Sequence, residues 1–248
     1  MRILRAIAVL AGLGLPLAVF QAQAAQLKVL QSNALKTVMD ELGPQFEKAT
    51  GNKLVPIVGT TAQLRGMIEK GEAFDVALFT KSALDDLAKQ GKIADAPRRA
   101  VARSGIGVAV RKGAAKPDVG TTTAFKNAML NAASIGYVKQ TPTAGNMKVI
   151  FAKLGIADQL QSKIKLLDVV VPEAVTKGEV EVGLTQISEI VPHRTIELAG
   201  PLPADIQVYT VFGGGVAPSA HDGAAALVQF LISPAAVSVL KANGMEPL

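Results

Sequence analysis

Apolar positions along this chain follow two spacings that alternate in order. Short apolar runs, such as 27–30 and 75–79, are typical of buried strands. Between these runs, apolar residues recur every three or four positions, as they do over 34–51, and this spacing predicts amphipathic helices. Strand and helix alternate along most of the chain. The pattern therefore predicts an α/β fold, in which a parallel sheet is covered by helices on both faces.

Turn and cap residues give approximate bounds to each predicted element. No internal repeat or low-complexity segment interrupts the order. Strands are predicted at 27–30, 53–58, 75–79, 104–112, 134–138, 164–170, 180–187 and 205–216. Helices are predicted at 34–51, 61–71, 82–90, 121–132, 143–155, 172–178, 222–232 and 234–243.

The predicted strands at 104–112 and 205–216 are longer than the others, and each could pass from one lobe of the molecule to another. We expect two discontinuous lobes, with residues 26–104 and 214–248 in the first and residues 105–213 in the second. Two crossings form a hinge, and the cleft between the lobes would be lined by strand ends and helix starts. Ligands in open α/β sheets bind at the carboxyl ends of the strands.

The N-terminal segment differs from the rest of the chain. Two arginines precede an uncharged, mostly apolar run at 6–20, and the small-x-small sequence "AQA" follows at 22–24. This arrangement predicts a secretory signal peptide over 1–24, cleaved after Ala24 or Ala25, and a mature protein in the periplasm. The apolar run, at about 15 residues, is short for a membrane span.

Composition narrows the chemistry that the chain could perform. It has no cysteine, so an exported fold must be stabilised by its core without disulfides. The net charge of +6 falls to +4 without Arg2 and Arg5, the charges are mixed in sign and tryptophan is absent, so we expect no nucleic-acid partner. His193 and His221 have no metal-ligand spacing, and the chain has no G-x-S-x-G, HExxH or P-loop motif. We therefore expect neither a metal nor a cofactor.

Two predicted helix starts carry candidate binding groups. Thr60 and Thr61 stand side by side where a helix begins, so one hydroxyl could cap the helix while the other faces a ligand. Thr143, Ala144 and Gly145 open another predicted helix, where free N–H groups carry about half a positive charge and favour an anion. Gly145 lacks a Cβ and would let a ligand approach the backbone.

Several segments together resemble the periplasmic molybdate-binding proteins of ABC transporters. The resemblance is carried by "ALKTVMDELGPQFEKATG", "TTAQLRGMIEKGEAFDVALF", "TPTAGNMKVIFAKLG", "KGEVEVGLTQISEI", "GPLPADIQVYTVFGGGV" and "FLISPAAVSVLKANGMEP". It covers essentially the whole mature chain, in the order and spacing of the family. The resemblance implies a type II periplasmic binding fold, with two discontinuous α/β lobes joined by two crossover strands. It also implies a tetrahedral oxyanion that is held by hydroxyls and backbone N–H groups, without a cation.

The family's ligand contacts match this sequence only in part. Thr61 keeps a hydroxyl at the start of the second helix, and the backbone donors of the family fall at Ala144 and near Val169. Ala34 stands where the family has a serine, and Gln186 stands where it has a tyrosine. An anion site is therefore expected, but two hydroxyl donors to molybdate are lost.

Neighbouring side chains could compensate for the lost hydroxyls. Ser32 or Asn33 could replace the missing serine from a slightly different position. Gln186 offers one donor and one acceptor, which suits a carboxylic acid or an amide as well as an oxyanion. Glu189 would repel an anion unless it turns away or is protonated.

The residues leave more than one function open. The first is a monomeric solute-binding protein that captures a small anion, either a molybdate-like oxyanion or a small carboxylate, and delivers it to an ABC permease. The alternative is an isomerase similar to the periplasmic aconitate isomerase, which resembles the same family. That activity needs an acid and a base, for which Glu189 and Lys139 are the candidates. A third option is a binder used for sensing.

Overall fold

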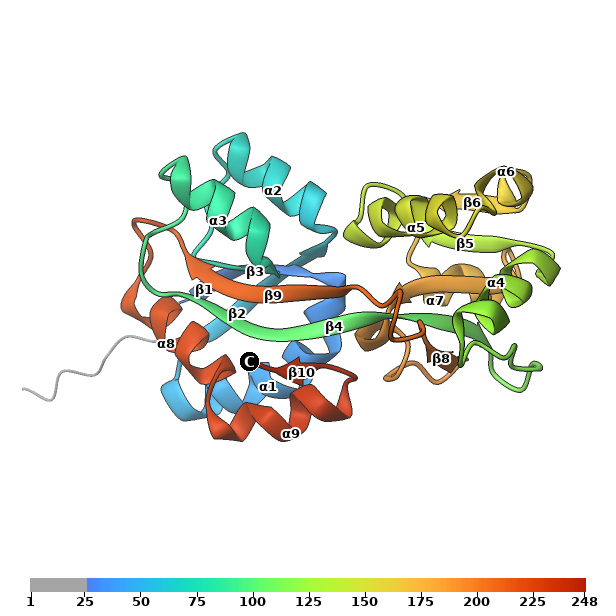
Figure 1. Ribbon diagram of the computed structural model, residues 1–248. Coiled ribbons are helices and arrows are strands. Elements are labelled where there is room, and N and C mark those ends of the chain that lie inside the picture. The colour runs from blue at the N-terminus through green and yellow to red at the C-terminus, as the bar shows by residue number, and fades with distance from the viewer. Residues whose placement is uncertain (1–25) are drawn as a thin grey trace, which may run out of the picture.

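The predicted strands and helices are all present in the computed structural model, which describes residues 26–248. The predicted signal peptide lies outside the described residues. Figure 1 shows two lobes, with strands β4 and β9 running between them. Lobe 1 contains the N-terminal and C-terminal parts of the described chain, and lobe 2 contains its middle.

Lobe 1 is built around the strands that begin the described chain. Its strands are β1 (Gln26–Ser32), β2 (Lys53–Gly59), β3 (Val76–Thr80), β9 (Tyr209–Val216) and β10 (Glu246–Pro247). Its helices are the short 3₁₀ helix η1 (Asn33–Leu35), α1 (Lys36–Thr50), α2 (Thr61–Glu69), α3 (Lys81–Lys89), α8 (Asp222–Leu231) and α9 (Pro234–Ala242).

Lobe 2 has the same layered construction. Its strands are β5 (Ile135–Val138), β6 (Ile164–Leu167), β7 (Val182–Gln186) and β8 (Ile196–Pro201). Its helices are α4 (Thr122–Asn131), α5 (Pro142–Lys153), α6 (Ala157–Leu160), α7 (Val171–Lys177) and the 3₁₀ helix η2 (Ile187–Glu189). The longest strand, β4 (Arg98–Arg111), belongs to both lobes.

The hydrogen-bonded strand order is β2-β1-β3-β9-β4-β7-β5-β6, and β8 and β10 each pair with β4. The pairs β1–β2, β1–β3, β5–β6 and β5–β7 are parallel, as predicted. However, β4 and β9 are antiparallel to their neighbours, so the prediction of a parallel sheet is wrong at its centre. The reason is topological, because β4 leaves lobe 1 along the path by which β9 returns.

Strand β4 changes its partners between Gly105 and Ile106. Residues 98–105 pair with β9, whereas residues 106–111 pair with β7 and β8. The division into 26–104 with 214–248 and 105–213 stays a proposal, and this change of partners supports its first boundary. Residues 212–216 of β9 pair with β3, and residues 209–215 of β9 pair with residues 98–105 of β4.

The Gln207 side chain braces the chain beside this crossing. Its Oε1 accepts a hydrogen bond from the Ile106 N–H (2.8 Å), and its Nε2 donates to the Ile106 carbonyl oxygen (3.0 Å). The side chain therefore adds to the backbone hydrogen bond that the Ile106 carbonyl oxygen accepts from the Leu202 N–H (3.0 Å). A Cβ at Gly105 would lie 2.9 Å from the Gln207 Nε2 atom, so the brace requires a glycine there.

Each half of the sheet has a core on both faces, as predicted for an α/β fold. In lobe 1, α1, α8 and α9 pack on one face around Phe46, while α2 and α3 pack on the other around Phe79. In lobe 2, α4, α5 and α6 cover one face around Phe125, and α7 covers the other. Each half of the sheet therefore has two cores of its own.

Several predicted bounds were wrong. β4 begins at Arg98 rather than 104, because its arginines hid the apolar pattern, and β9 begins at Tyr209 rather than 205. The first helix begins as η1 and continues as α1 from Lys36. α5 begins at Pro142, because Thr141 caps it. The short elements β8, β10 and α6 were not predicted.

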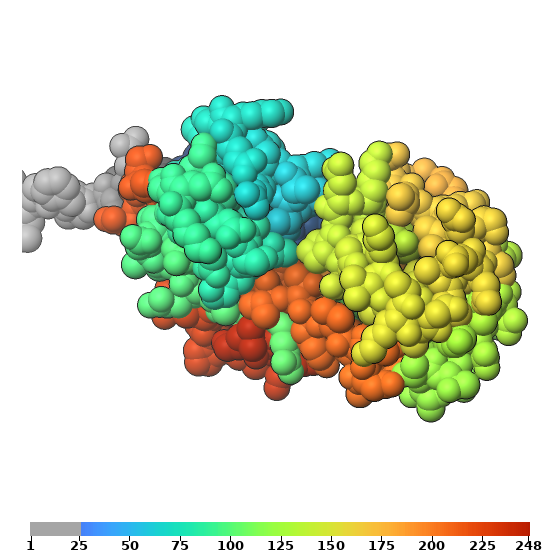
Figure 2. All heavy atoms as spheres, turned by 45° about the horizontal axis from the view of Figure 1, so that its top comes forward, coloured from blue at the N-terminus to red at the C-terminus, as the bar shows by residue number. Residues whose placement is uncertain are grey.

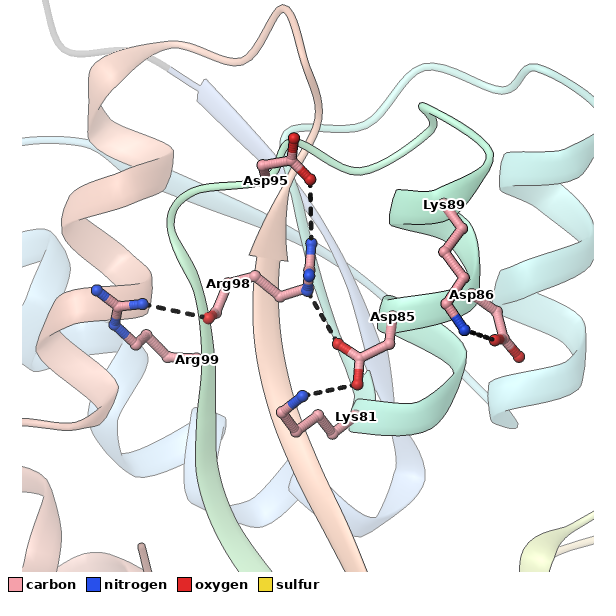
Figure 3. Close-up of polar contacts among 7 residues, drawn as sticks. All are labelled: Lys81, Asp85, Asp86, Lys89, Asp95, Arg98 and Arg99. Atoms are coloured by element: carbon pink, nitrogen blue, oxygen red, sulfur yellow. Dashed lines mark hydrogen bonds and ion pairs between the residues drawn. The ribbon is translucent and has the colours of Figure 1, made fainter.

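A group of ion pairs ties the start of β4 to α3 (Figure 3). Asp85 accepts from the Lys81 Nζ atom at 2.6 Å and from the Arg98 Nε atom at 2.9 Å, and Arg98 also lies 3.7 Å from Asp95. The hydrogen bond from Lys81, supported by the charges of Lys81 and Arg98, holds the pKa of Asp85 below its usual range. This group lies on the surface of lobe 1 and fixes the crossover strand to it.

We expect Asp85→Asn to lower the free energy of unfolding by about 0.5–1 kcal/mol at pH 7, the value of a partly exposed ion pair. A lowered folded-state pKa gives stability that is present above the unfolded pKa of Asp and is lost as pH falls through the folded pKa. The difference between the variant and the wild type should therefore be smaller at pH 3 than at pH 7. Urea unfolding at pH 7 and pH 3 measures it.

Asp86→Asn is the control. The Asp86 carboxylate lies 3.5 Å from the Lys89 Nζ atom, so its loss should change stability less. An equal loss at both pH values would contradict the argument.

No single helix in residues 26–248 is long and apolar enough to cross a membrane. Helices α8 and α9 together would be long and apolar enough, but the chain bends by 61° between them. The same residues contain no group of three or more His, Cys, Asp or Glu side chains placed to hold a metal ion.

Candidate anion-binding site between the lobes

A small cavity of about 50 Å³ lies between the lobes, at the carboxyl ends of β1, β2, β3 and β7. Figure 2 shows the two lobes meeting at this seam, with the α2 region of lobe 1 against the α5 region of lobe 2. The cavity is lined from lobe 1 by Ser32, Asn33, Ala34, Gly59, Thr60, Thr61, Thr80, Thr210 and Phe212. It is lined from lobe 2 by Val138, Thr141, Pro142, Thr143, Leu184, Thr185, Gln186 and Glu189.

A larger open groove of about 970 Å³ lies on lobe 2, among α4, α7 and the segment that follows β4. Its charged side chains are of both signs, with Arg111 and Lys116 beside Asp118 and Glu181. The smaller cavity is the better candidate, because the starts of α2 and α5 meet there from the two lobes, and the start of a helix is a common place for an anion to bind.

At the start of α2, the two threonines have different environments. Thr60 is the N-cap, because its hydroxyl oxygen accepts from the Gln63 N–H (3.2 Å) and its own N–H donates to the Gln63 Oε1 atom (2.8 Å). This reciprocal pair is a capping box. Thr61 is the first helical residue and also lines the cavity, and the N–H groups of Thr61 and Ala62 have no acceptor within the helix.

The turn after β1 brings Ser32, Asn33 and Ala34 to the cavity together. The Ser32 hydroxyl is buried and has no hydrogen-bond partner within residues 26–248. A buried hydroxyl without a partner is unusual and costs free energy. The predicted replacement of the missing serine at Ala34 by a nearby hydroxyl is therefore geometrically available at Ser32.

At the start of α5, the backbone donors are used differently from the prediction. The Thr141 hydroxyl oxygen accepts from the Ala144 N–H (3.3 Å), and the Gly145 N–H donates to the Thr141 carbonyl oxygen (3.3 Å). Neither Ala144 nor Gly145 lines the cavity, and a Cβ at Gly145 would meet open space. The residue that reaches the cavity from this helix is Thr143, which is buried.

Gln186 ends β7 and links both lobes through its amide. Its Nε2 atom donates to the Thr143 hydroxyl at 3.2 Å and to the Thr210 hydroxyl at 3.1 Å. The Gln186 Oε1 atom is buried and has no partner in the part of the chain that the structure describes. Both threonine hydroxyls act as acceptors here, so each keeps its own hydrogen available for a ligand.

The Gln186 amide can serve either as donor or as acceptor. When it is turned by 180°, its oxygen accepts from the same two hydroxyls and its NH₂ group faces the cavity. Both orientations satisfy the hydroxyls, because a hydroxyl can donate or accept. The Gln186 amide can therefore present either a donor or an acceptor to the cavity.

Glu189 lines the cavity from the 3₁₀ turn that follows β7. One of its carboxylate oxygens, Oε2, accepts a hydrogen bond from the Thr185 hydroxyl. Burial raises the pKa of the Glu189 carboxyl group, although the hydrogen bonds from the Thr185 hydroxyl and the Gln186 backbone oppose the change. A carboxyl group in this environment holds a proton more readily than an exposed one.

Two other predicted residues do not reach the cavity. The Lys139 ammonium group forms a half-exposed ion pair with Asp168. Val169 is partly buried and packs against the core beside α7. As predicted, both histidines lie at the surface.

A family model described as bacterial extracellular solute-binding protein matches residues 27–246 of this chain. The chain belongs to this family. The solute-binding protein is 32% identical over 230 residues to an aconitate isomerase from Pseudomonas sp., a match that covers 90% of this chain and 88% of the relative. It is 27% identical over 242 residues to the molybdate-binding protein ModA of Azotobacter vinelandii, with 94% of each chain covered.

The solved periplasmic molybdate-binding protein of Azotobacter vinelandii superposes on the solute-binding protein with a TM-score of 0.74. The two share 20% identity, and the match covers 88% of this chain and 98% of the other. The predicted type II periplasmic binding fold is confirmed, and so is the resemblance to the molybdate-binding proteins. The family also agrees with the predicted location outside the cytoplasm.

Sequence reasoning missed several threonines of this solute-binding protein that line the cavity. Thr80 ends β3, Thr141 caps α5 and Thr185 lies near the end of β7, all positions that face the cleft in this fold. The position of each at a strand end or helix start was a usable signal. Thr210 lies near the start of β9, and no local pattern indicates that it meets Gln186.

Proposed function

We propose that this solute-binding protein captures a small anion in the interlobe cavity and delivers it to an ABC permease. The observation that carries the proposal is the pair of buried, unpartnered atoms, Ser32 Oγ and Gln186 Oε1, in one cavity between the lobes. Buried polar atoms nearly always have partners, so two such atoms that face one space are suited to contact a ligand.

The neutral donors around the cavity favour an anion. The N–H groups at the start of α2 and the hydroxyls of Ser32, Thr61, Thr143 and Thr210 can all donate. Donors of this kind bind a small oxyanion or a small carboxylate through several hydrogen bonds, each of which is worth more in a cavity shielded from water. The molybdate-binding relative supports an oxyanion, and the aconitate isomerase relative supports a carboxylate.

We propose that a small carboxylate binds more tightly than molybdate. Ala34 and Gln186 replace two hydroxyl donors of the molybdate-binding family. Glu189 adds acceptor atoms that a fully ionised molybdate cannot use, whereas a carboxylic acid or hydroxyl group can.

A panel of anions tests this proposal by thermal unfolding and calorimetry. The panel contains molybdate, sulfate, inorganic phosphate, trans-aconitate and cis-aconitate. A ligand at 100 times its Kd stabilises the folded state by about 2.7 kcal/mol, which raises the melting temperature by roughly 5–10 °C for a chain of this size. We expect such a shift with at least one carboxylate and a smaller one with molybdate. The absence of a saturable shift with every anion would overturn the anion-binding proposal.

A second candidate function is the isomerisation of an unsaturated polycarboxylate such as aconitate. Glu189 favours it, because a carboxyl group with a raised pKa in the cavity can remove a proton from one carbon. The double bond then shifts by one position, and the same carboxyl group returns the proton to the carbon at the other end. Lys139, the other predicted group, lies outside the cavity.

An absorbance assay of trans- and cis-aconitate interconversion decides between the binder and the isomerase. The isomerase hypothesis predicts turnover that Glu189→Gln abolishes. Glu173→Gln is the matched control, because the Glu173 carboxylate pairs with Lys177 on the exposed face of α7. Binding of aconitate without turnover would leave the protein as a binder only.

A further inference from the structure

We propose that the cavity binds its anion together with one proton, which is held between the ligand and the Glu189 carboxyl group. This inference rests on the proposed anion site and adds the protonation state of what binds there. It narrows the ligand class to anions that carry a hydrogen-bond donor when they are bound.

The first step is the position of Glu189 among neutral groups. No Lys, Arg or His is among the described residues that line the cavity, and Glu189 is the one ionisable side chain in that lining. An ionised Glu189 would therefore meet a bound anion with no cation between them. Like charges in a partly dehydrated site repel strongly, and this raises the pKa of one of the two groups.

The second step is the set of charges on the elements that pack around Glu189. The neighbouring elements η1 and β7 carry no ionisable side chain. His193 follows four residues later on the surface, where burial of part of its ring and the charge of Lys36 lower its pKa. The remaining cations of β4 and the start of α1 are engaged as follows: Arg98 with Asp85, Arg99 with the Arg98 carbonyl oxygen, Arg103 with Glu246, Arg111 with the Val175 carbonyl oxygen, and Lys36 with Asp40.

The third step is the geometry of the carboxyl group itself. Thr185 donates to Oε2, and the Gln186 backbone also donates to this carboxylate. A carboxylate has about four acceptor positions, so it can still share a proton with a ligand. With a proton present, a short hydrogen bond between the carboxyl group and the anion replaces the repulsion. The Gln186 amide, which can face the cavity with either its oxygen or its NH₂ group, fits a ligand that carries both a donor and an acceptor.

These contacts predict a preference among anions of similar shape. Inorganic phosphate holds a proton near neutral pH and can bring it into the cavity. Sulfate is tetrahedral and of similar size but has only acceptor oxygens, so its binding needs Glu189 to be protonated. A polycarboxylate that keeps one carboxylic acid proton resembles phosphate in this respect.

The experiment measures calorimetric affinities for sulfate, inorganic phosphate and trans-aconitate between pH 5 and pH 8.5. The wild type should bind phosphate at least about tenfold more tightly than sulfate at pH 7.5. Its affinity for sulfate should fall about tenfold per pH unit once Glu189 ionises, because one proton is linked to binding. Titrations in buffers of different ionisation enthalpy should count one proton taken up with sulfate.

Three variants separate this role from a structural one. Glu189→Gln should tighten sulfate binding at pH 7.5, remove its pH dependence and remove the proton uptake. Thr185→Val should move the pH midpoint upward, because the Thr185 hydroxyl stabilises the ionised carboxylate. Glu173→Gln, with its exposed carboxylate on α7, should behave as the wild type. Circular dichroism and melting temperatures check that each variant is folded.

The outcomes distinguish this inference from the proposed function. If an anion binds, but its affinity has the same pH dependence in the wild type and in Glu189→Gln and the wild type takes up no proton with sulfate, only the inference is overturned. If none of the anions binds to the wild type, the anion-binding proposal fails and this inference fails with it.

Discussion

Thr61→Ala should weaken binding of the preferred anion by roughly 10- to 150-fold. Thr61 lines the cavity, and its hydroxyl is not needed for capping, because Thr60 already caps α2. Removing one donor to a charged ligand costs about 1.5–3 kcal/mol, and about 1.4 kcal/mol corresponds to a factor of ten in affinity. Calorimetry with the tightest anion of the panel measures the change. The stability of the variant should change by no more than about 1 kcal/mol, the value of a lost cap.

Thr121→Ala is the matched control for this result. Thr121 caps α4 through a hydrogen bond from the Ala124 N–H (3.1 Å) and lies outside the cavity. Its loss should therefore lower stability by about 1 kcal/mol and leave affinity unchanged. If Thr61→Ala binds the anion as tightly as the wild type, the threonines at the start of α2 serve only that helix.

Gly213→Ala should destabilise the protein by about 1–3 kcal/mol, the usual cost of overpacking. Gly213 lies in β9 between Phe79 of β3 and Ala100 of β4. A Cβ there would lie 2.6 Å from the Arg99 carbonyl oxygen, a backbone atom that cannot move without disturbing the sheet. Chemical unfolding measures the loss.

Gly66→Ala is the control for Gly213→Ala, and it should stabilise the protein rather than destabilise it. Gly66 lies inside α2, and a Cβ there would have no atom within 4 Å. Alanine should stabilise the helix by about 0.5–1 kcal/mol. A comparable loss in both variants would show that the close packing of Gly213 is not the cause.

Much of the fold could be predicted from the sequence because its pattern is local. The spacing of Val38, Leu42 and Phe46 indicated α1, and these residues are buried as expected. Local patterns failed where neighbours in space decide the structure. β4 begins at Arg98 because it pairs with β9, more than 100 residues later in the chain. The four-residue helix α6 and the two-residue strand β10 are too short to show a period.

The candidate site could be predicted in part for the same reason. Thr60 and Thr61 were recognisable because a cap is a local feature. Ala144 was expected at the very start of its helix, but α5 begins earlier, at Pro142, with Thr141 as its cap. Proline is common at the first helical position, so Pro142 was a signal for the true start. The contact of Gln186 with Thr143 and Thr210 joins residues 43 and 24 positions apart, so no spacing could indicate it.

The position of β2 at one end of the sheet bears on self-association. An edge strand presents unpaired N–H and C=O groups to which a second chain can add a strand. β2 carries exposed Val55 and Val58, which would favour such pairing, but Pro56 between them has no N–H to donate and Lys53 adds a charge. Pro56 and Lys53 therefore disfavour the addition of a second chain at this edge while the protein folds. Because Val55 and Val58 favour such pairing, the edge would be more prone to aggregation without Pro56.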